Sequence, residues 1–139
     1  MDERIVKFLK KMHLASVCTI DDDGQPYAFS AFYAFDEVNF CLLLASSDES
    51  SHIKFLKNSK LVAGTVALDT KIVGKIEGVQ FQGVMREASA SEREIYFKRF
   101  FYAKAMDPKI WSISLEKVKF TSNTLGFGKK IKWERGDKI

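Results

Sequence analysis

Cysteine, histidine and proline are scarce in this sequence, with two of each among 139 residues, and long apolar runs are absent. The cysteines, Cys18 and Cys41, are too few for a disulfide framework. With the scattered histidines they also lack the ligand spacing of a zinc site, so no metal site is predicted. Each cysteine lies in an apolar run, which predicts a small buried residue. No apolar run approaches the length of a membrane-spanning helix.

Signal and catalytic motifs are missing as well. Residues 1–7 alternate charged and bulky side chains and lack the apolar stretch and cleavage site of a secretory signal, so a cytoplasmic protein is expected. The sequence has no nucleophile elbow, Walker A loop or dinucleotide fingerprint. No local motif pairs a nucleophile with a histidine, so the catalytic residues stay unassigned. Any reaction is expected to depend on a bound cofactor.

The composition is that of one compact domain covering residues 1–139. Hydrophobic residues make up 46% of the chain, and 12 residues are phenylalanine. The net charge of +4 is uneven, because residues 117–139 carry seven Lys or Arg and only two acidic residues. Such a basic C-terminal segment is suited to phosphate groups, nucleic acid or an acidic partner, but it is equally compatible with a solvated tail.

Local patterns predict three helices. Apolar residues recur at helical spacing behind Asp2, a candidate N-cap, so one helix is expected over 3–13. Two further helices, ending near positions 58 and 104, are expected after Ser-x-x-Glu sequences at 46–49 and 91–94 that resemble capping boxes.

Apolar alternation and turn residues predict about six strands. They cover 14–20, 27–35, 38–45, 61–68, 75–88 and 111–120. In the last strand the apolar residues on either side of Glu116-Lys117 are out of phase, which a β-bulge would reconcile. The remaining chain is predicted to form a turn at 126–130 and a polar tail. Because the strands are grouped as hairpins, the expected fold is a barrel or an α+β fold rather than a doubly wound sheet.

The predicted strand 27–35 has two unlike faces. Because successive strand residues point to opposite sides, one face is mostly aromatic and the other mostly small. The aromatic face, predicted to be core, comprises Tyr27, Phe29, Ala31, Tyr33 and Phe35. The opposite face comprises Ala28, Ser30, Phe32 and Ala34. The small face leaves room for a flat ligand against the backbone, or for a neighbouring subunit or helix.

Three segments are candidates for ligand binding. The turn Ser50-Ser51-His52 enters a helix, where free amides, hydroxyls and an imidazole suit an anion. Gln80 and Gln82, with Arg86, offer polar groups on one face of a strand. The loop 126–130 combines two glycines with two lysines. The simpler alternatives are a capped helix, a solvated sheet face and an ordinary turn.

The order of several segments resembles the FMN-binding split-barrel family, the relatives of pyridoxamine 5′-phosphate oxidase. Within that family the sequence is similar to the small bacterial YhbP-like proteins. The matching segments run through nearly the whole chain. They are Ser30-Ala31-Phe32-Tyr33, Ser51-His52, Val62-Ala63-Gly64-Thr65-Val66, Gly78-Val79-Gln80-Phe81-Gln82-Gly83 and the stretch 119–130. The last two are specific to the YhbP-like group, and the others are general to the superfamily.

The resemblance implies a fold, a cofactor and an assembly. The fold is mainly β with short flanking helices: a six-stranded antiparallel split β-barrel of Greek-key type. The assembly is a homodimer with an FMN site at each interface. Phe29, Ser30, Ala31 and Phe32 would run beside the isoalloxazine ring, and Ser50, Ser51 and His52 would hold the phosphate. Gln80 or Gln82 would reach the flavin, and Lys129 and Lys130 would approach from the partner subunit.

The sequence departs from the family pattern in two places. Many flavin-binding relatives have a basic run at the phosphate turn, whereas Ser50-Ser51-His52 carries fewer fixed charges and is expected to bind phosphate more weakly. The basic C-terminal substrate motif of the oxidase is missing, so pyridoxamine phosphate oxidation is not expected.

The sequence leaves three functional hypotheses. The leading one is an FMN-binding protein, a flavin-dependent oxidoreductase acting on an unknown small substrate. The second is a haem-binding split barrel with His13 or His52 as axial ligand. The third is a non-enzymatic barrel that acts through protein or nucleic-acid contacts, with nucleic acid the less favoured partner because no aromatic-plus-basic motif is present.

Overall fold

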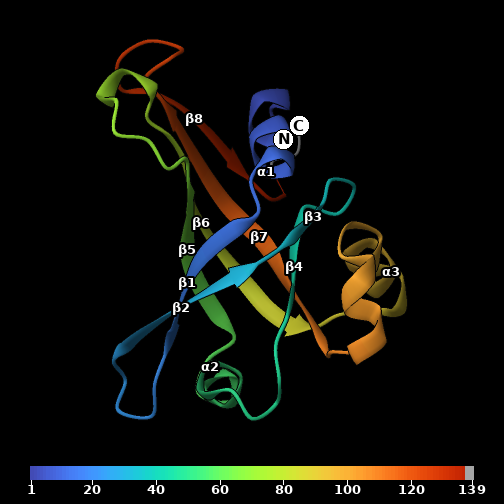
Figure 1. Ribbon diagram of the computed structural model, residues 1–139. Helices are drawn as coiled ribbons and strands as arrows, with labels where there is room; N and C mark the ends of the chain where they lie inside the picture. Colours follow the sequence, from blue (N-terminus) through green and yellow to red (C-terminus); the bar gives the residue numbers. More distant parts are fainter. Residues whose placement is uncertain (137–139) are drawn as a thin grey trace.

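The computed structural model describes residues 1–136 and consists of one strongly curled antiparallel sheet with short helices at its margins (Figure 1). The last three residues of the basic segment, 137–139, lie outside the described part. The strands are β1 (Leu14–Ile20), β2 (Pro26–Phe32), β3 (Ala34–Asp36), β4 (Cys41–Ala45), β5 (Leu61–Ala67), β6 (Glu77–Glu87), β7 (Ile110–Ser122) and β8 (Lys129–Glu134). The α-helices are α1 (Glu3–Lys11), α2 (Ser51–Lys54) and α3 (Ala90–Arg99). The 3₁₀ helices are η1 (Phe55–Lys57), η2 (Val73–Lys75) and η3 (Phe101–Met106). None of the helices in the described residues has the length and apolar character needed to cross a bilayer.

The strand order is β2-β1-β5-β6-β7-β4-β3, with β8 added to the second half of β7. The first and last strands of this order are joined in the chain by a single residue, Tyr33. The sheet must therefore curl until its two edges approach each other, which makes it an open, split barrel. The expected fold class is confirmed, but the expected count of six strands is wrong, because residues 1–136 contain eight.

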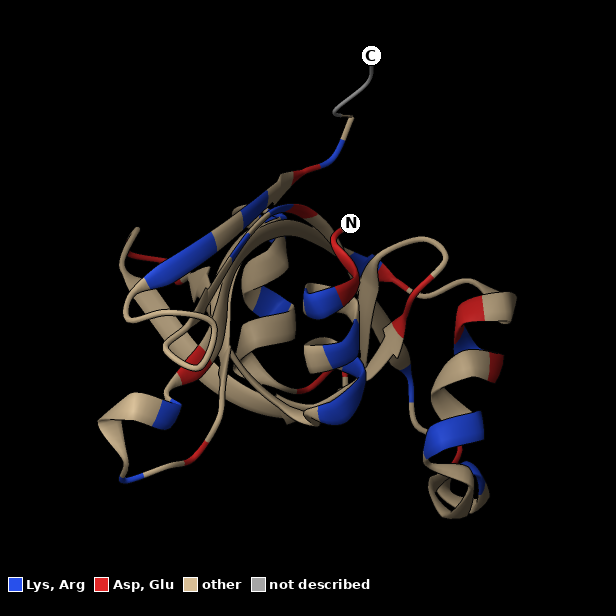
Figure 2. Ribbon diagram, turned by 90° about the horizontal axis from the view of Figure 1, so that it is seen from above, with Lys and Arg blue, Asp and Glu red and all other residues tan. Residues whose placement is uncertain are grey.

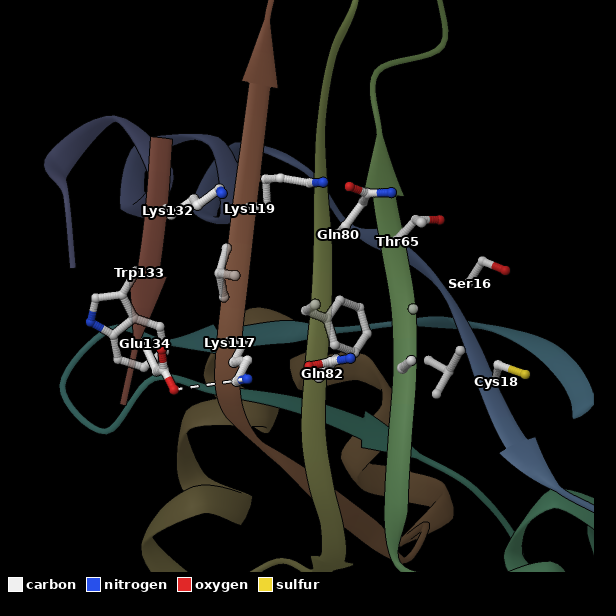
Figure 3. Close-up of a pocket in the computed structure, with 15 residues that line it drawn as sticks. Ser16, Cys18, Thr65, Gln80, Gln82, Lys117, Lys119, Lys132, Trp133 and Glu134 are labelled. Atoms are coloured by element: carbon white, nitrogen blue, oxygen red, sulfur yellow. Dashed lines mark ion pairs between the residues drawn. The ribbon is translucent and has the colours of Figure 1, made fainter. Parts of the chain in front are cut away.

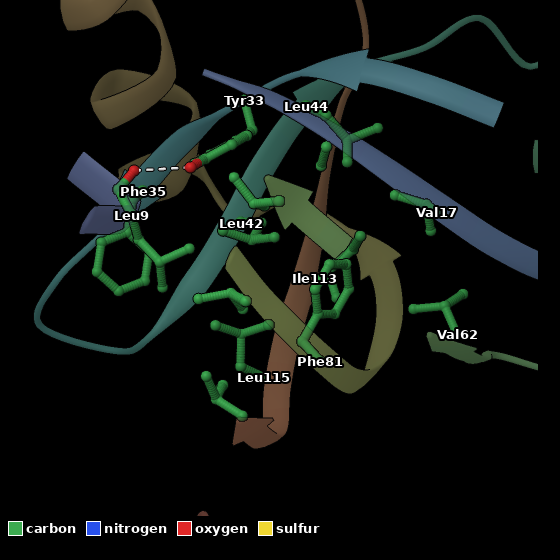
Figure 4. Packing of buried hydrophobic residues seen from close by; sticks show 14 of the residues in the cluster. Leu9, Val17, Tyr33, Phe35, Leu42, Leu44, Val62, Phe81, Ile113 and Leu115 are labelled. Atoms are coloured by element: carbon green, nitrogen blue, oxygen red, sulfur yellow. Dashed lines mark hydrogen bonds between the residues drawn. The ribbon is translucent and has the colours of Figure 1, made fainter. Parts of the chain in front are cut away.

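Tyr33 accounts for one of the two extra strands. The predicted strand 27–35 divides here, since β2 pairs with β1 whereas β3 pairs with β4. Tyr33 itself donates its amide to the His13 carbonyl and its hydroxyl to the Leu9 carbonyl, 2.7 Å away (Figure 4). Burial raises the pKa of the Tyr33 hydroxyl, so it remains a donor at neutral pH. The other extra strand, β8, was expected to be a turn and a polar tail.

The β-bulge near Glu116 is confirmed. Gln82 of β6 pairs with Lys117 of β7, but the next residue, Gly83, pairs with Leu115, so Glu116 is the extra residue. Because of the bulge, the apolar residues on both sides of Glu116 point to the same face of the sheet. The residues Ile113, Leu115, Val118 and Phe120 are all buried in the same core.

Helix α1 closes one end of the barrel. The Asp2 carboxylate accepts the Arg4 amide at 2.8 Å, as expected for an N-cap. Ile5, Phe8 and Leu9 are buried in the core cluster. The helix ends at Lys11 rather than 13, because the backbone of Met12 is extended, and the His13 carbonyl accepts the Tyr33 amide just before β1.

Both predicted capping boxes are wrong in position. Helix α3 is capped two residues earlier, by Ser89 and Glu92, because Glu92 also binds Arg86 of β6 and Ser112 of β7. Helix α2 begins only at Ser51 and has no side-chain cap bond. The helices are also shorter than expected, since α3 ends at Arg99 and continues as η3.

Candidate functional site

The face of the sheet that points away from the core carries two rows of outward side chains. Strand residues alternate between the faces, and Val17, Val66, Val79, Phe81 and Val118 are turned into the core. The outward-facing residues that alternate with these are aligned across the sheet by the register of the strands. The first row, from β2 to β8, is Ser30, Ser16, Thr65, Gln80, Lys119 and Lys132. The second row is Ala28, Cys18, Ala63, Gln82, Lys117 and Glu134.

These rows, from β1 to β8, line an open groove of about 730 Å³ (Figure 3). This volume lies within the usual range of small-molecule sites. The β1, β5 and β6 side of the groove presents hydroxyl, thiol and amide groups. The β7 and β8 side presents three lysines and one glutamate, of which Lys117 and Glu134 form an ion pair with Nζ 3.9 Å from Oε1. The groove therefore has a neutral polar end and a basic end.

Gly64 allows the strands beneath the groove to approach closely. A Cβ atom at this position would point inward, against the carbonyl oxygen of Ser16 and within 2.5 Å of the Phe81 ring. The adjacent outward residue, Ala63, is small. No side chain larger than alanine therefore rises from the floor of the groove at this point of β5, which suits a flat ligand.

The Ser50–His52 turn forms a second, separate cluster beside the middle of β2. The His52 and Phe29 rings are stacked, with centroids 3.7 Å apart and an interplanar angle of 8°. Nε2 of His52 lies 2.5 Å from the Ser46 hydroxyl oxygen. Burial lowers the pKa of His52, so its imidazole is predominantly neutral at pH 7. The turn therefore offers an anion neutral donors rather than a fixed positive charge.

The structure divides the predicted site residues between several places. Ser30, Gln80 and Gln82 share the groove face, and Phe32 lies on the same face near the end of β2. Phe29 and Ala31 point to the opposite face, where they pack against the core. Ser50, Ser51 and His52 do not line the groove.

The two predicted lysines lie on β8, at the opposite end of the molecule from α2 (Figure 1). Lys130 is paired with Thr121 and Lys129 with Ser122. Within one chain these lysines and the α2 turn do not meet, so their predicted cooperation would require a partner subunit.

Sequence reasoning missed four residues of the first row: Ser16, Thr65, Lys119 and Lys132. Alternation within β1 and β5 was a sufficient signal for Ser16 and Thr65, because the apolar residues beside them identify the core face. Lys119 could be placed only once the bulge at Glu116 was located. Lys132 required β8, whose alternation of lysine with Ile131 and Trp133 resembles a polar tail when its partner is unknown.

A buried acidic cluster lies elsewhere, between α3 and the sheet. Ligand-type atoms of Asp36, Cys41 and Glu92 lie within 4.8 Å of one another. However, both Glu92 oxygens accept bonds from Arg86, and one also accepts the Ser112 hydroxyl. The Asp36 carboxylate caps the following turn. These bonds give the carboxylates a structural role.

Comparison with known proteins places these observations in context. No family model matches the chain. The chain is 39% identical over 135 residues to the UPF0306 protein YhbP of Salmonella schwarzengrund, covering 94% of this chain and 91% of the relative.

Many solved structures share the fold, and two of them illustrate it. A haem-binding protein from Mycobacterium smegmatis superposes with a TM-score of 0.72 at 16% identity, over 88% of this chain. The chain spans about half of that protein, 53% of its length. An FAD-binding protein from Mesorhizobium loti superposes with a TM-score of 0.69 at 16% identity, over 86% of this chain and 94% of its own. At these identities the likeness establishes the fold alone.

Proposed function

Because the chain belongs to the UPF0306 YhbP family and has the fold of flavin- and haem-binding split barrels, we propose that it binds a flavin in the groove of the open sheet face. The observation that carries this proposal is the first row of the groove. Ser16, Thr65 and Gln80 stand side by side across three strands, followed directly by Lys119.

The donor chemistry of the row fits an isoalloxazine ring. The pyrimidine edge of the ring alternates N–H and C=O groups, and an amide side chain can both donate and accept. Gln80 and Gln82 supply two such amides, and Ser16 and Thr65 supply hydroxyls. The small side chain of Ala63 leaves the floor of the groove flat enough for a planar group. When bound, FMN supplies electron transfer, while the residues of this chain bind and orient it.

The proposed assembly is a homodimer with one site at each interface. Leu14 and Phe32 are paired across β1 and β2, next to the groove, and are 48% and 57% exposed. Exposed apolar residues beside a polar groove are suited to contact with a second copy. Ser50, Ser51 and His52 lie outside the groove of their own chain, so their proposed contact with the phosphate would be made across this interface. The proposed reaction is oxidoreduction of a small molecule.

Replacing Gln80 with leucine is expected to weaken FMN binding about tenfold, because one hydrogen bond to the ring is lost and an apolar group faces its polar edge. Quenching of flavin fluorescence during titration with the purified protein measures this affinity. Gln25→Leu, in the exposed turn before β2, is the matched control and should bind FMN like the unaltered chain. A colourless protein that leaves FMN fluorescence unchanged would rule out the proposed function.

Haem binding is the second candidate, and His13 favours it. The His13 side chain is exposed at the start of β1, and its ring stacks on Phe32 with centroids 5.7 Å apart. An accessible imidazole beside an exposed aromatic ring is suited to axial ligation of a planar macrocycle. Addition of haem would then produce a Soret band that His13→Ala abolishes and His52→Ala retains. A band of equal intensity in both variants would argue against His13 as ligand.

A further inference from the structure

Lys119 and Lys132 form an unfavourable pair across β7 and β8. The register places them directly opposite each other on the groove face. Like charges in such positions destabilise a sheet, and opposite charges stabilise it. The next outward-facing pair along the same two strands, Lys117 with Glu134, has opposite charges and is therefore favourable.

No carboxylate within residues 1–136 neutralises this pair. Neither lysine has a carboxylate oxygen within 4.0 Å, although five other lysines of the described chain do. Lys119 is also half-buried, which reduces the screening of its charge by water. Lys130 adds a third positive charge on the same face, two residues from Lys132.

The two side chains are directed along the first row of the groove. Lys132 points toward Lys119, and Lys119 points toward Gln80 (Figure 3). Lysines follow one another along the strand that leads to the C-terminus (Figure 2). Two ammonium groups that no carboxylate of residues 1–136 neutralises therefore follow one another along the first row, at the basic end of the groove.

We infer that Lys119 and Lys132 bind the phosphate group of a small-molecule ligand in the groove. A phosphate accepts charge-assisted hydrogen bonds from both ammonium groups and removes their mutual repulsion. Gln80, beside Lys119, supplies a neutral donor to the same ligand. The phosphate belongs either to a flavin nucleotide, in which case Lys119 and Lys132 hold it in place of the Ser50–His52 turn, or to a second, phosphorylated ligand. Binding of a free phosphate compound to the two lysines does not require flavin.

Calorimetric titration with inorganic pyrophosphate, without flavin and at constant ionic strength, tests this inference. We expect one saturable site per chain, with affinity reduced about tenfold or more in Lys132→Met and further in the double variant with Lys119→Met. Lys132→Arg keeps the charge and should bind within about threefold of the unaltered chain. Lys71→Met, in the exposed loop before η2, is the matched control and should leave the affinity unchanged.

Thermal unfolding gives a readout that separates binding from folding. Lys132→Met is expected to raise the melting temperature in phosphate-free, low-salt buffer, because the repulsion is removed. The same variant should lose the additional rise that pyrophosphate causes in the unaltered chain. Lys71→Met should show neither effect.

Competition identifies the source of the phosphate. If pyrophosphate displaces FMN but not riboflavin, the lysines bind the phosphate of the flavin nucleotide. If pyrophosphate and FMN bind at the same time, the lysines bind the phosphate of a second ligand. Both results support the site. Because pyrophosphate is titrated alone, a failure of flavin binding leaves this test intact. Absence of saturable binding, or equal affinity in the double lysine variant, would overturn the inference.

Discussion

Replacement of Arg86 with methionine is expected to lower the free energy of unfolding by about 3 kcal/mol. Arg86 donates to both oxygens of Glu92, at 2.7 and 3.0 Å, and Glu92 is only 4% exposed. Without the guanidinium, a buried carboxylate loses its counter-charge and two of its donors. The expected loss is at the lower end for a buried ion pair, because Arg86 is itself partly exposed.

The pH dependence of this loss distinguishes electrostatics from packing. Burial acts to raise the pKa of Glu92, but hydrogen bonds from Arg86, the Ser89 amide and the Ser112 hydroxyl outweigh it and lower the pKa to about 2. Because the pKa of Glu92 is lower in the folded than in the unfolded chain, the carboxylate stabilises the fold at pH values above its usual pKa of 4.5. This contribution to the free energy of unfolding is lost as the pH falls toward 2. Arg86→Met raises the pKa of Glu92, so the difference in stability should be largest near pH 7 and shrink below about pH 4.5.

Urea unfolding of both chains between pH 7 and pH 3 measures this difference. Arg93→Met is the control, because Arg93 pairs with the exposed Asp107 at 2.9 Å and a surface ion pair contributes only about 0–1 kcal/mol. A difference for Arg86→Met that stays constant over this pH range would show that lost packing, rather than the ion pair, is responsible.

Replacement of Gly64 with alanine is expected to destabilise the fold by about 3 kcal/mol, the upper end for overpacking. The added Cβ would overlap the carbonyl oxygen of Ser16, a backbone atom that cannot rotate away, and would also press on the Phe81 ring. Both contacts lie directly beneath the groove. β1 and β5 would have to separate, so ligand binding should weaken together with stability.

Gly74→Ala is the matched control, since a Cβ there meets no atom within 4 Å. Thermal and urea unfolding of the two variants give the comparison. Adding Phe81→Leu to Gly64→Ala should recover little stability, because the backbone contact with Ser16 remains. Equal stability of the Gly64 and Gly74 variants would contradict the close approach of β1 and β5.

Several features were predicted correctly because neighbouring residues in the chain determine them. The β1 strand has the expected bounds, and Asp2 caps α1. The out-of-phase apolar residues of β7 located the bulge at Glu116. The resemblance of the segments identified the family and the split barrel, which the comparisons confirm. FMN, the homodimer and the proposed site residues stay predictions.

Other features depend on partners far along the chain. The Ser-x-x-Glu spacing occurs both at 89–92 and at 91–94, so the spacing alone does not locate the cap of α3. The cap forms at Ser89 and Glu92 because Glu92 also binds Arg86 and Ser112. Burial lowers the pKa of the His52 imidazole, which contacts Ser46 and Phe29. No local pattern could reveal that state of the proposed phosphate turn.

By itself the sequence determined six stretches of strand, because side-chain alternation and turn chemistry act over a few residues, and its resemblance to a known family gave the class of barrel. Only the tertiary structure decided which outward side chains share a groove, because strand register joins Ser16, Gln80 and Lys132 from positions more than 100 residues apart in the chain. The pairing of Lys119 with Lys132, which no carboxylate of residues 1–136 neutralises, has the same origin, since β8 sets the two lysines opposite each other.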